Sequence, residues 1–338
     1  MSLVSGALLI AITGAAAWSA TALALRFLAT HAILDRPNER SSHRRPTPRG
    51  AGIALVPVIV LAWSASGIMA DAALLHWLVV AAAALLAVVS WLDDVRDLQP
   101  APRFLAHIVA VAVVLACLPA DRLVFQGWLP PVLDRLAAGL LWVWFVNLSN
   151  FMDGIDGIAG VETASIGIGI AAIAAFGGGL SAAGVAMLPL GLTLAAAAIG
   201  FLAWNWHPAR IFLGDVGSVP IGFLSGWLLI AAAANGAWAA ALILPAYYLA
   251  DASITLARRA ARLEPIWRAH RQHFYQQAVA AGHGHDRVAI VVAALNLTLI
   301  GIAMASERVP LLALAGAAVA TGAVLVGFAR SGRPIARS

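Results

Sequence analysis

The sequence lacks lysine, has one cysteine and carries few charges. All 21 basic residues are arginine, and 11% of the 338 residues are charged while 62% are hydrophobic. A single cysteine, Cys117, excludes an internal disulfide and a cysteine-based zinc site. The mean hydropathy of +0.89 excludes an ordinary soluble domain. The first apolar run is too long for a signal peptide and no positively charged segment precedes it, so we expect it to be retained as a membrane span.

Long apolar runs fill most of the chain. Runs of about 18 or more apolar residues are typical of transmembrane helices, and inside lipid a helix satisfies every backbone polar group within its own segment. Candidate spans lie at about 3–28, 51–70, 73–92, 104–119, 132–149, 158–177, 184–204, 218–235, 237–256, 288–305 and 310–328. The sequence therefore predicts an all-α, polytopic integral membrane protein with about 11 transmembrane helices and one domain over residues 1–338.

The arginines are distributed unevenly between the predicted connections. If the N-terminus lies outside, 18 of the 21 arginines fall on the cytoplasmic side, where basic residues concentrate. We therefore expect a periplasmic N-terminus, a cytoplasmic C-terminus and no nucleic-acid partner. Four aromatic residues near predicted span ends are interpreted as interfacial anchors, namely Trp142, Trp204, Tyr247 and Tyr248.

The same topology brings the polar segments to one side of the membrane. They lie at about 30–50, 93–103, 147–157, 205–217 and 257–287. This asymmetry indicates a cytoplasmic active site at the membrane surface, whereas a transporter more often places its polar residues at the midplane. Glu162 and Asp251 are isolated acids inside predicted spans, so they keep a cation-coupled transporter open as an alternative. Their role stays open at this point.

Two acidic segments carry oxygen ligands. In "WLDDVRDL" the adjacent carboxylates of Asp93 and Asp94 suit Mg²⁺, although a solvated helix end is an alternative. In "NLSNFMDGIDG" polar residues recur every three positions, which would place them along one side of a helix; they are Asn147, Asn150, Asp153 and Asp156. Amides and carboxylates in such a row can bind a nucleobase and a metal. The alternative is a helix terminus with turn chemistry.

A third acid and a basic segment complete the candidate set. Asp215 lies between glycines in "FLGDVGS", where it would either hold a metal and diphosphate or cap the next helix, and Asn205 precedes it as a hydrogen-bonding partner. "RAHRQHFYQQ" supplies groups for phosphate or proton transfer, or for anionic lipid headgroups; we select His270, Arg271 and His273. The basic loop near residues 36–49 could bind a lipid phosphate. His207, His283 and His285 are interpreted as surface or loop residues.

The combined set favours one class of chemistry. Within the sequence there is no GxxxxGK[ST] phosphate loop and no defensible Ser-His-Asp order. Acids, arginines, histidines and asparagines on one face suit Mg²⁺-dependent phosphoryl transfer, in which catalysis is mostly positioning and charge neutralisation.

Five ordered segments resemble a known family. They are "DRPNERSSHRRPTPRGAG", "WLDDVRDL", "NLSNFMDGIDGIAG", "FLGDVGSVPIG" and "HRQHFYQQ", and they cover about residues 35–277. In this order they resemble the signature segments of the polyprenyl-phosphate N-acetylhexosamine-1-phosphate transferases. The resemblance implies an integral membrane enzyme of ten or eleven helices. Such an enzyme moves a sugar-1-phosphate from a UDP-sugar to polyprenyl phosphate, with Mg²⁺, and releases UMP.

The resemblance also implies roles for individual residues. Asp93 and Asp94 match the aspartate pair near the acceptor phosphate, and the first would deprotonate the acceptor. Asp215 matches the principal Mg²⁺ ligand and Asn150 an additional one, with Mn²⁺ as a substitute metal. Positions lining the nucleotide site match Asn147, Asp153, Asp156 and Asn205. The loop that holds the diphosphate and sugar matches His270, Arg271 and His273, while the lipid-phosphate side would be held by Arg44, Arg45 and Arg49.

The last loop separates the branches of the family. The muramoyl-pentapeptide branch carries three consecutive histidines there, and the enterobacterial GlcNAc-1-phosphate branch a His-Ile-His-His run, whereas this chain has "HRQHFYQQ". The segment is more similar to the branch that initiates O-antigen and other surface polysaccharides in the bacterial inner membrane. The acceptor would be undecaprenyl phosphate and the donor a UDP-N-acetylhexosamine. The muramoyl-pentapeptide transferase, a transporter and a non-catalytic scaffold are alternatives, and a homodimer is left open.

Overall fold

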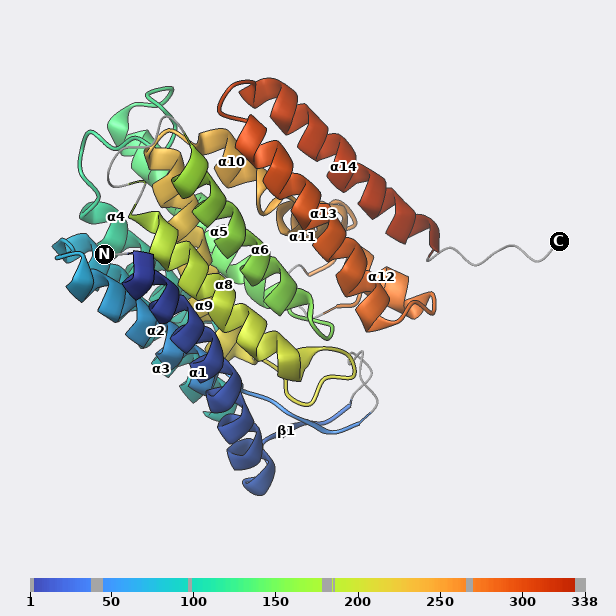
Figure 1. Ribbon diagram of the computed structural model, residues 1–338. Coiled ribbons are helices and arrows are strands. Elements are labelled where there is room, and N and C mark those ends of the chain that lie inside the picture. The colour runs from blue at the N-terminus through green and yellow to red at the C-terminus, as the bar shows by residue number, and fades with distance from the viewer. Residues whose placement is uncertain are drawn as a thin grey trace.

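The computed structural model describes residues 3–37, 45–96, 99–177, 184, 186–265 and 270–331, and these are almost entirely helical (Figure 1). The helices are α1 Leu3–Thr30, α2 Gly52–Met69, α3 Leu74–Arg96, α4 Pro100–Ala116, α5 Pro131–Phe151, α6 Ile158–Phe176, α8 Met187–Asn205, α9 Asp215–Ala234, α10 Trp238–Ile243, α11 Ala246–Ala261, α12 Phe274–Ala280, α13 His285–Ala305 and α14 Pro310–Ser331. A small antiparallel hairpin pairs β1 Leu34–Asp35 with β2 Thr47–Pro48.

The helices confirm an all-α polytopic membrane protein. Within the described residues, nine helices are long and apolar enough to cross a membrane, and α4 is a shorter apolar helix. Every predicted span overlaps a helix, but the segment predicted at 237–256 is divided into α10 and α11 at Pro245, where a continuous helix would lose a backbone donor. The exact number of spans and the side on which each terminus lies stay predictions.

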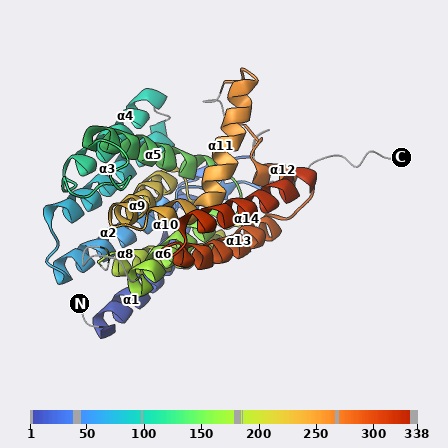
Figure 2. The ribbon, with the colours of Figure 1, turned by 90° about the horizontal axis from the view of Figure 1, so that it is seen from above.

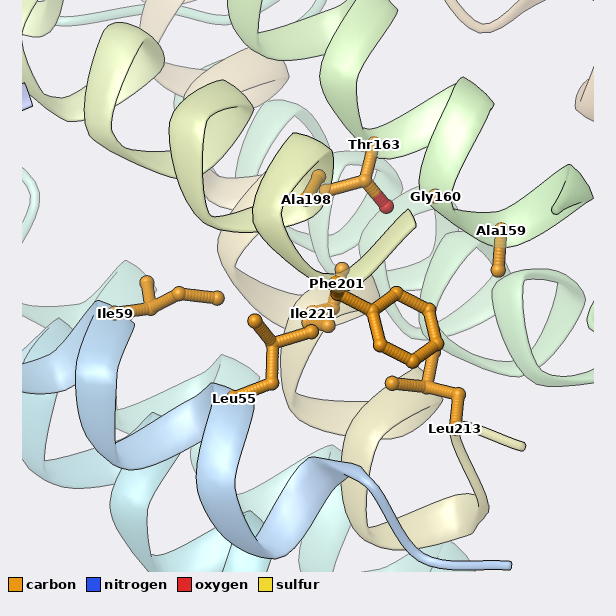
Figure 3. A pocket seen from close by; sticks show the side chains of 9 residues that line it. All are labelled: Leu55, Ile59, Ala159, Gly160, Thr163, Ala198, Phe201, Leu213 and Ile221. Atoms are coloured by element: carbon orange, nitrogen blue, oxygen red, sulfur yellow. The ribbon is translucent and has the colours of Figure 1, made fainter. Parts of the chain in front are cut away.

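Helix α9 occupies the centre of the bundle. Every residue in its most apolar window is buried, and it contacts α2, α3, α5, α6 and α10 (Figure 2). Near its start it packs at an apolar junction with α2, α6 and α8, where Leu55, Thr163, Phe201 and Ile221 meet (Figure 3). Because α9 begins at Asp215, this buried helix fixes the position of that carboxylate.

Small residues let two helices of the bundle approach closely. A Cβ added at Gly191 would lie 2.6 Å from the carbonyl oxygen of Gly167, so α6 and α8 are in backbone contact there. Close packing through small residues is a common way to associate helices in membranes.

The interpretation of Trp142, Tyr247 and Tyr248 as interfacial anchors is wrong. Their exposed fractions are 1%, 0% and 2%, because they face neighbouring helices inside the bundle. The Trp142 indole donates to the Phe223 carbonyl at 3.0 Å, which satisfies its polar atom without water.

Candidate active site

The hairpin and the segment before α9 hold the start of α9 in place. The Phe212 amide donates to the Pro48 carbonyl at 2.8 Å, and the Gly50 amide donates to the Phe212 carbonyl at 3.0 Å. Gly52 lies against Gly217 so closely that a Cβ would collide with its backbone. This backbone pairing carries Arg49 to the side of Asp215.

Three carboxylates and two guanidinium groups form a compact cluster at this point. Arg49 Nη2 lies 2.6 Å from Asp215 Oδ1 and 3.3 Å from Asp94 Oδ1. Arg103, at the start of α4, pairs with Asp93 and lies 3.6 Å from Asp215 Oδ2. With three carboxylates and two guanidinium groups, the cluster has a formal net charge of −1, which suits a bound cation.

A cavity of about 750 Å³ opens beside this cluster. Its polar lining residues are Ser90, Asp93, Arg103, His107, Asn147, Asn150, Asp215, His270 and His273. The structure thus brings six of the predicted residues to one cavity from four separate parts of the chain. Asp215 and Asn150 both offer oxygen atoms to it, so the donor set fits a hard cation such as Mg²⁺.

The row of four polar residues is only half helical. Asn147 and Asn150 lie on the last turns of α5, but the helix ends at Phe151. The expectation that Asp153 and Asp156 share their helix face is therefore wrong. The glycines at 154 and 157 favour turns, and Gly157 adopts φ 80°, a left-handed conformation.

Asp153 is half-buried in this turn and does not line the cavity. Burial first, opposed by Arg49 and supported by the negative charges of Asp215 and Asp156, raises the pKa of Asp153 to about 7. A carboxyl with this pKa changes its charge close to neutral pH.

Asp156 is the centre of a hydrogen-bonded group that includes two histidines. His207 Nδ1 lies 2.6 Å from Asp156 Oδ2, and His285 Nδ1 lies 3.3 Å from Asp156 Oδ1. Burial opposes ionisation, but hydrogen bonds from His285 and His207 prevail and lower the pKa of Asp156. His207 is exposed and lies in a loop, as interpreted from the sequence, whereas the interpretation of His285 as a loop residue is wrong, because it is buried at the start of α13.

The Asp156 group also has the composition of a transition-metal site. One ligand atom from each of Asp156, His207 and His285 lies within 4.8 Å of the others. His285 Nδ1 lies 3.3 Å from both the Asp156 amide nitrogen and Asp156 Oδ1, and this one ring nitrogen can serve only one of them, as acceptor from the amide or as donor to the carboxylate. The two histidines link Asp156 to the segment before α9 and to the start of α13.

Asn205 connects the turn that contains Asp156 to the segment before α9. Its Oδ1 accepts from the Gly157 amide at 2.9 Å and its Nδ2 donates to the Ile211 carbonyl at 2.9 Å. Both ends of the amide thus contact backbone, which gives Asn205 a positioning role. Its predicted contact with the nucleotide stays a prediction.

His270 and His273 lie side by side, although not on a helix as expected. Helix α12 begins at Phe274, and His273 has extended backbone before it. The two rings stack with centroids 4.8 Å apart. Burial lowers the pKa of His270 to about 4, with the positive charges of His273 and Arg259 acting in the same direction. His270 is therefore neutral at physiological pH.

The predicted basic residues divide into three groups. Arg49 contacts the carboxylate cluster, while Arg45 and Arg271 are exposed and do not line the cavity. Arg44 lies outside the described residues. Arg103 was not selected from the sequence, because spacing alone does not show that α4 turns back onto Asp93. The available signal was that Arg103 lies in the same predicted cytoplasmic connection as Asp93.

Comparisons with known proteins agree on one family. The model of Glycosyl transferase family 4 matches residues 76–233. A glycosyltransferase of Streptomyces coelicolor is 32% identical over 324 residues, which cover 91% of this chain and 73% of the relative. A Bacillus subtilis protein named as an undecaprenyl-phosphate N-acetylglucosaminyl 1-phosphate transferase is 28% identical over 269 residues, 77% of this chain and 73% of the relative. A phospho-N-acetylmuramoyl-pentapeptide-transferase of Moorella thermoacetica is 36% identical over 104 residues, 31% of this chain and 30% of the relative.

Proposed function

The chain belongs to glycosyl transferase family 4, the polyprenyl-phosphate N-acetylhexosamine-1-phosphate transferases, and from that membership we propose that the cavity transfers an N-acetylhexosamine-1-phosphate from a UDP-sugar to undecaprenyl phosphate. The protein is a multi-pass membrane enzyme, a phosphoglycosyl transferase that uses a polyprenyl phosphate and a nucleotide-sugar. The observation that carries the finer proposal is the cavity itself, in which Asp93, Asn150, Asp215 and His273 meet beside two arginines.

In the proposed reaction one P–O bond at the β-phosphorus of the UDP-sugar forms and another breaks. A phosphate oxygen of undecaprenyl phosphate attacks the β-phosphorus of the UDP-sugar and forms a new P–O bond. The P–O bond from the β-phosphorus to the bridging oxygen breaks, and UMP leaves with that oxygen. The product is a lipid-diphosphate sugar, and no oxidant or further reactant is required.

Different residues of the cluster would act on the lipid phosphate and on the diphosphate of the donor. Asp93, which pairs with Arg103 at the start of α4, is the proposed acceptor for a proton of the lipid phosphate. Arg49 and Arg103 offset negative charge around Asp215 and toward incoming phosphates. Asp215 and Asn150 would hold Mg²⁺, with Mn²⁺ as a substitute, and the ion would neutralise diphosphate charge.

The proposed donor and pathway rest on the named relatives and on the sequence of the last loop. The Bacillus subtilis relative is named for N-acetylglucosamine and undecaprenyl phosphate, which supports a UDP-N-acetylhexosamine donor. We assign the product to the initiation of O-antigen or a related surface polysaccharide in the bacterial inner membrane. A UDP-MurNAc-pentapeptide donor is disfavoured, because the match to a muramoyl enzyme covers 31% of this chain and the last loop reads "HRQH".

The test is release of UMP by the purified protein in detergent, with undecaprenyl phosphate, Mg²⁺ and a panel of donors. The panel contains UDP-GlcNAc, UDP-acetamido-6-deoxyhexoses and UDP-MurNAc-pentapeptide. We expect UMP only when lipid, metal and an N-acetylhexosamine donor are all present. Folded protein that releases UMP only with UDP-MurNAc-pentapeptide would support the muramoyl alternative, and silence across the panel would reject the proposal.

A further inference from the structure

Asp251 is a fully buried carboxylate on α11 that accepts an unusual number of hydrogen bonds. Its exposed fraction is 0%. The donors and their distances are Tyr247 Oη at 3.2 Å, Thr255 Oγ1 at 3.3 Å, His273 Nδ1 at 3.0 Å, the Phe274 amide at 3.0 Å and the Tyr275 amide at 3.2 Å. Burying a carboxylate is costly unless it is fully hydrogen-bonded. This one is, and three of its donors belong to residues 273–275.

The contact with Asp251 fixes the orientation of the His273 ring. Since Nδ1 donates to the carboxylate, Nε2 lies on the opposite side of the imidazole. The ring is stacked between His270, at 4.8 Å, and Tyr275, at 5.6 Å between centroids. His273 lines the same cavity as Asp93 and Asp215, and among the described residues Nε2 has no hydrogen-bond partner.

The same carboxylate joins α11 to the first residues of α12. Figure 2 shows α11 leaving the bundle, and Asp251 ties it to the start of α12. Tyr275 then donates to the Phe151 carbonyl at 3.2 Å, and the Arg258 guanidinium lies 4.8 Å from the centre of the Phe274 ring. His273 is therefore held relative to the end of α5, which carries Asn150.

We propose that Asp251 is a positioning residue for the transfer reaction and acts through His273. It holds the Nδ1–H of the imidazole, so that Nε2 is directed at a phosphate oxygen of the bound substrates. The proposal rests on the proposed function, because it assigns the phosphates to the cavity that His273 lines. Under this proposal Asp251, which the sequence alone left open as a feature of a transporter, belongs to the transferase site.

The test compares Asp251→Asn, His273→Gln and the double variant in the UMP-release assay. Asparagine keeps the volume of the side chain but removes the charge. We expect Asp251→Asn to lower kcat about ten- to hundredfold with the KM of both substrates changed less than about twofold, as for other residues that orient a functional histidine. The double variant should be no slower than His273→Gln, because Asp251 then has no histidine to orient.

A purely structural role for Asp251 predicts a different result. The loss from Asp251→Asn would then multiply the loss from His273→Gln, and this outcome would overturn the proposal. Glu162→Gln is the matched control, because Glu162 is a 2% exposed carboxylate inside α6 that accepts from Asn296 Nδ2 at 2.8 Å and lies outside the cavity. We expect its kcat to stay within about twofold of the wild-type value.

Histidine NMR of the wild-type protein in detergent gives a readout that needs neither turnover nor a stable Asp251 variant. A low-field Nδ1–H proton signal that disappears in His273→Gln supports the Asp251–His273 bond. A His273 ring protonated only at Nε2 would overturn it. If wild-type protein releases no UMP although this signal is present, the proposed function fails while the assigned orientation of His273 holds.

Discussion

Arg49 separates two carboxylates that would otherwise repel each other. Its guanidinium lies 2.6 Å from Asp215 and 3.3 Å from Asp94. We predict that Arg49→Gln lowers UMP release at least about tenfold, because it leaves this negative charge unbalanced where the phosphates must bind. Arg287→Gln, which removes an exposed arginine at the start of α13, is the matched control. Equal rates for the two variants would show that the Arg49 contact is dispensable.

His270 makes the folded protein sensitive to acid in a defined pH range. Burial first, and then nearby positive charge, lowers its pKa from 6.5 to about 4 in the folded state. The unfolded chain therefore binds the proton more readily, so stability is present above pH 6.5 and is lost as pH falls toward 4. We predict that His270→Gln loses less thermal stability over this range. Parallel melting-temperature curves for variant and wild type would contradict the assignment.

At the scale of elements, the contact between α2 and α9 depends on two glycines. A Cβ at Gly52 would collide with the Gly217 backbone, whereas a Cβ at Gly322 on α14 would meet nothing within 4 Å. We predict that Gly52→Ala destabilises the protein by about 1–3 kcal/mol, as overpacking does. Gly322→Ala should be neutral or slightly stabilising, because alanine favours helix. Thermal unfolding in detergent checks both, and similar melting temperatures would count against this packing.

The sequence predicts the helices well and their contacts poorly. Apolar runs mark each span because lipid demands them, and Pro245 explains the one span that is divided. The burial of Trp142 and Tyr247 depends on which helices are neighbours, which no periodicity reveals.

The same limit applies to the candidate site. Motif order allowed six cavity residues to be selected in advance, because a shared chemistry requires acids, amides and histidines together. Arg103 was missed because its pairing with Asp93 depends on how α4 turns back onto the end of α3, and the contacts of His207 and His285 with Asp156 were missed because they join segments that are distant in the sequence. The predicted roles of Asp94, Arg45 and Arg271 stay predictions.

For the whole molecule, the orientation in the membrane decides which substrates can reach the cavity. With 18 of 21 arginines on the side of the polar loops, we predict that this side is cytoplasmic. The chain suits cysteine labelling, because Cys117 is its single cysteine and can be replaced by serine. In that background Ala281→Cys, just after α12, should react with an impermeant thiol reagent in inverted vesicles and not in intact cells. Labelling in intact cells alone would reverse the topology.

The central claim is that the cavity beside Asp215 is where phosphoryl transfer occurs. UMP release by Asp215→Asn, compared with Asp121→Asn, tests it most directly. Asp121 is a suitable control, because its side chain is 80% exposed and it lies outside the cavity. We predict that Asp215→Asn, shown to be folded, releases no measurable UMP while Asp121→Asn keeps the wild-type rate. Wild-type turnover by Asp215→Asn would contradict the account.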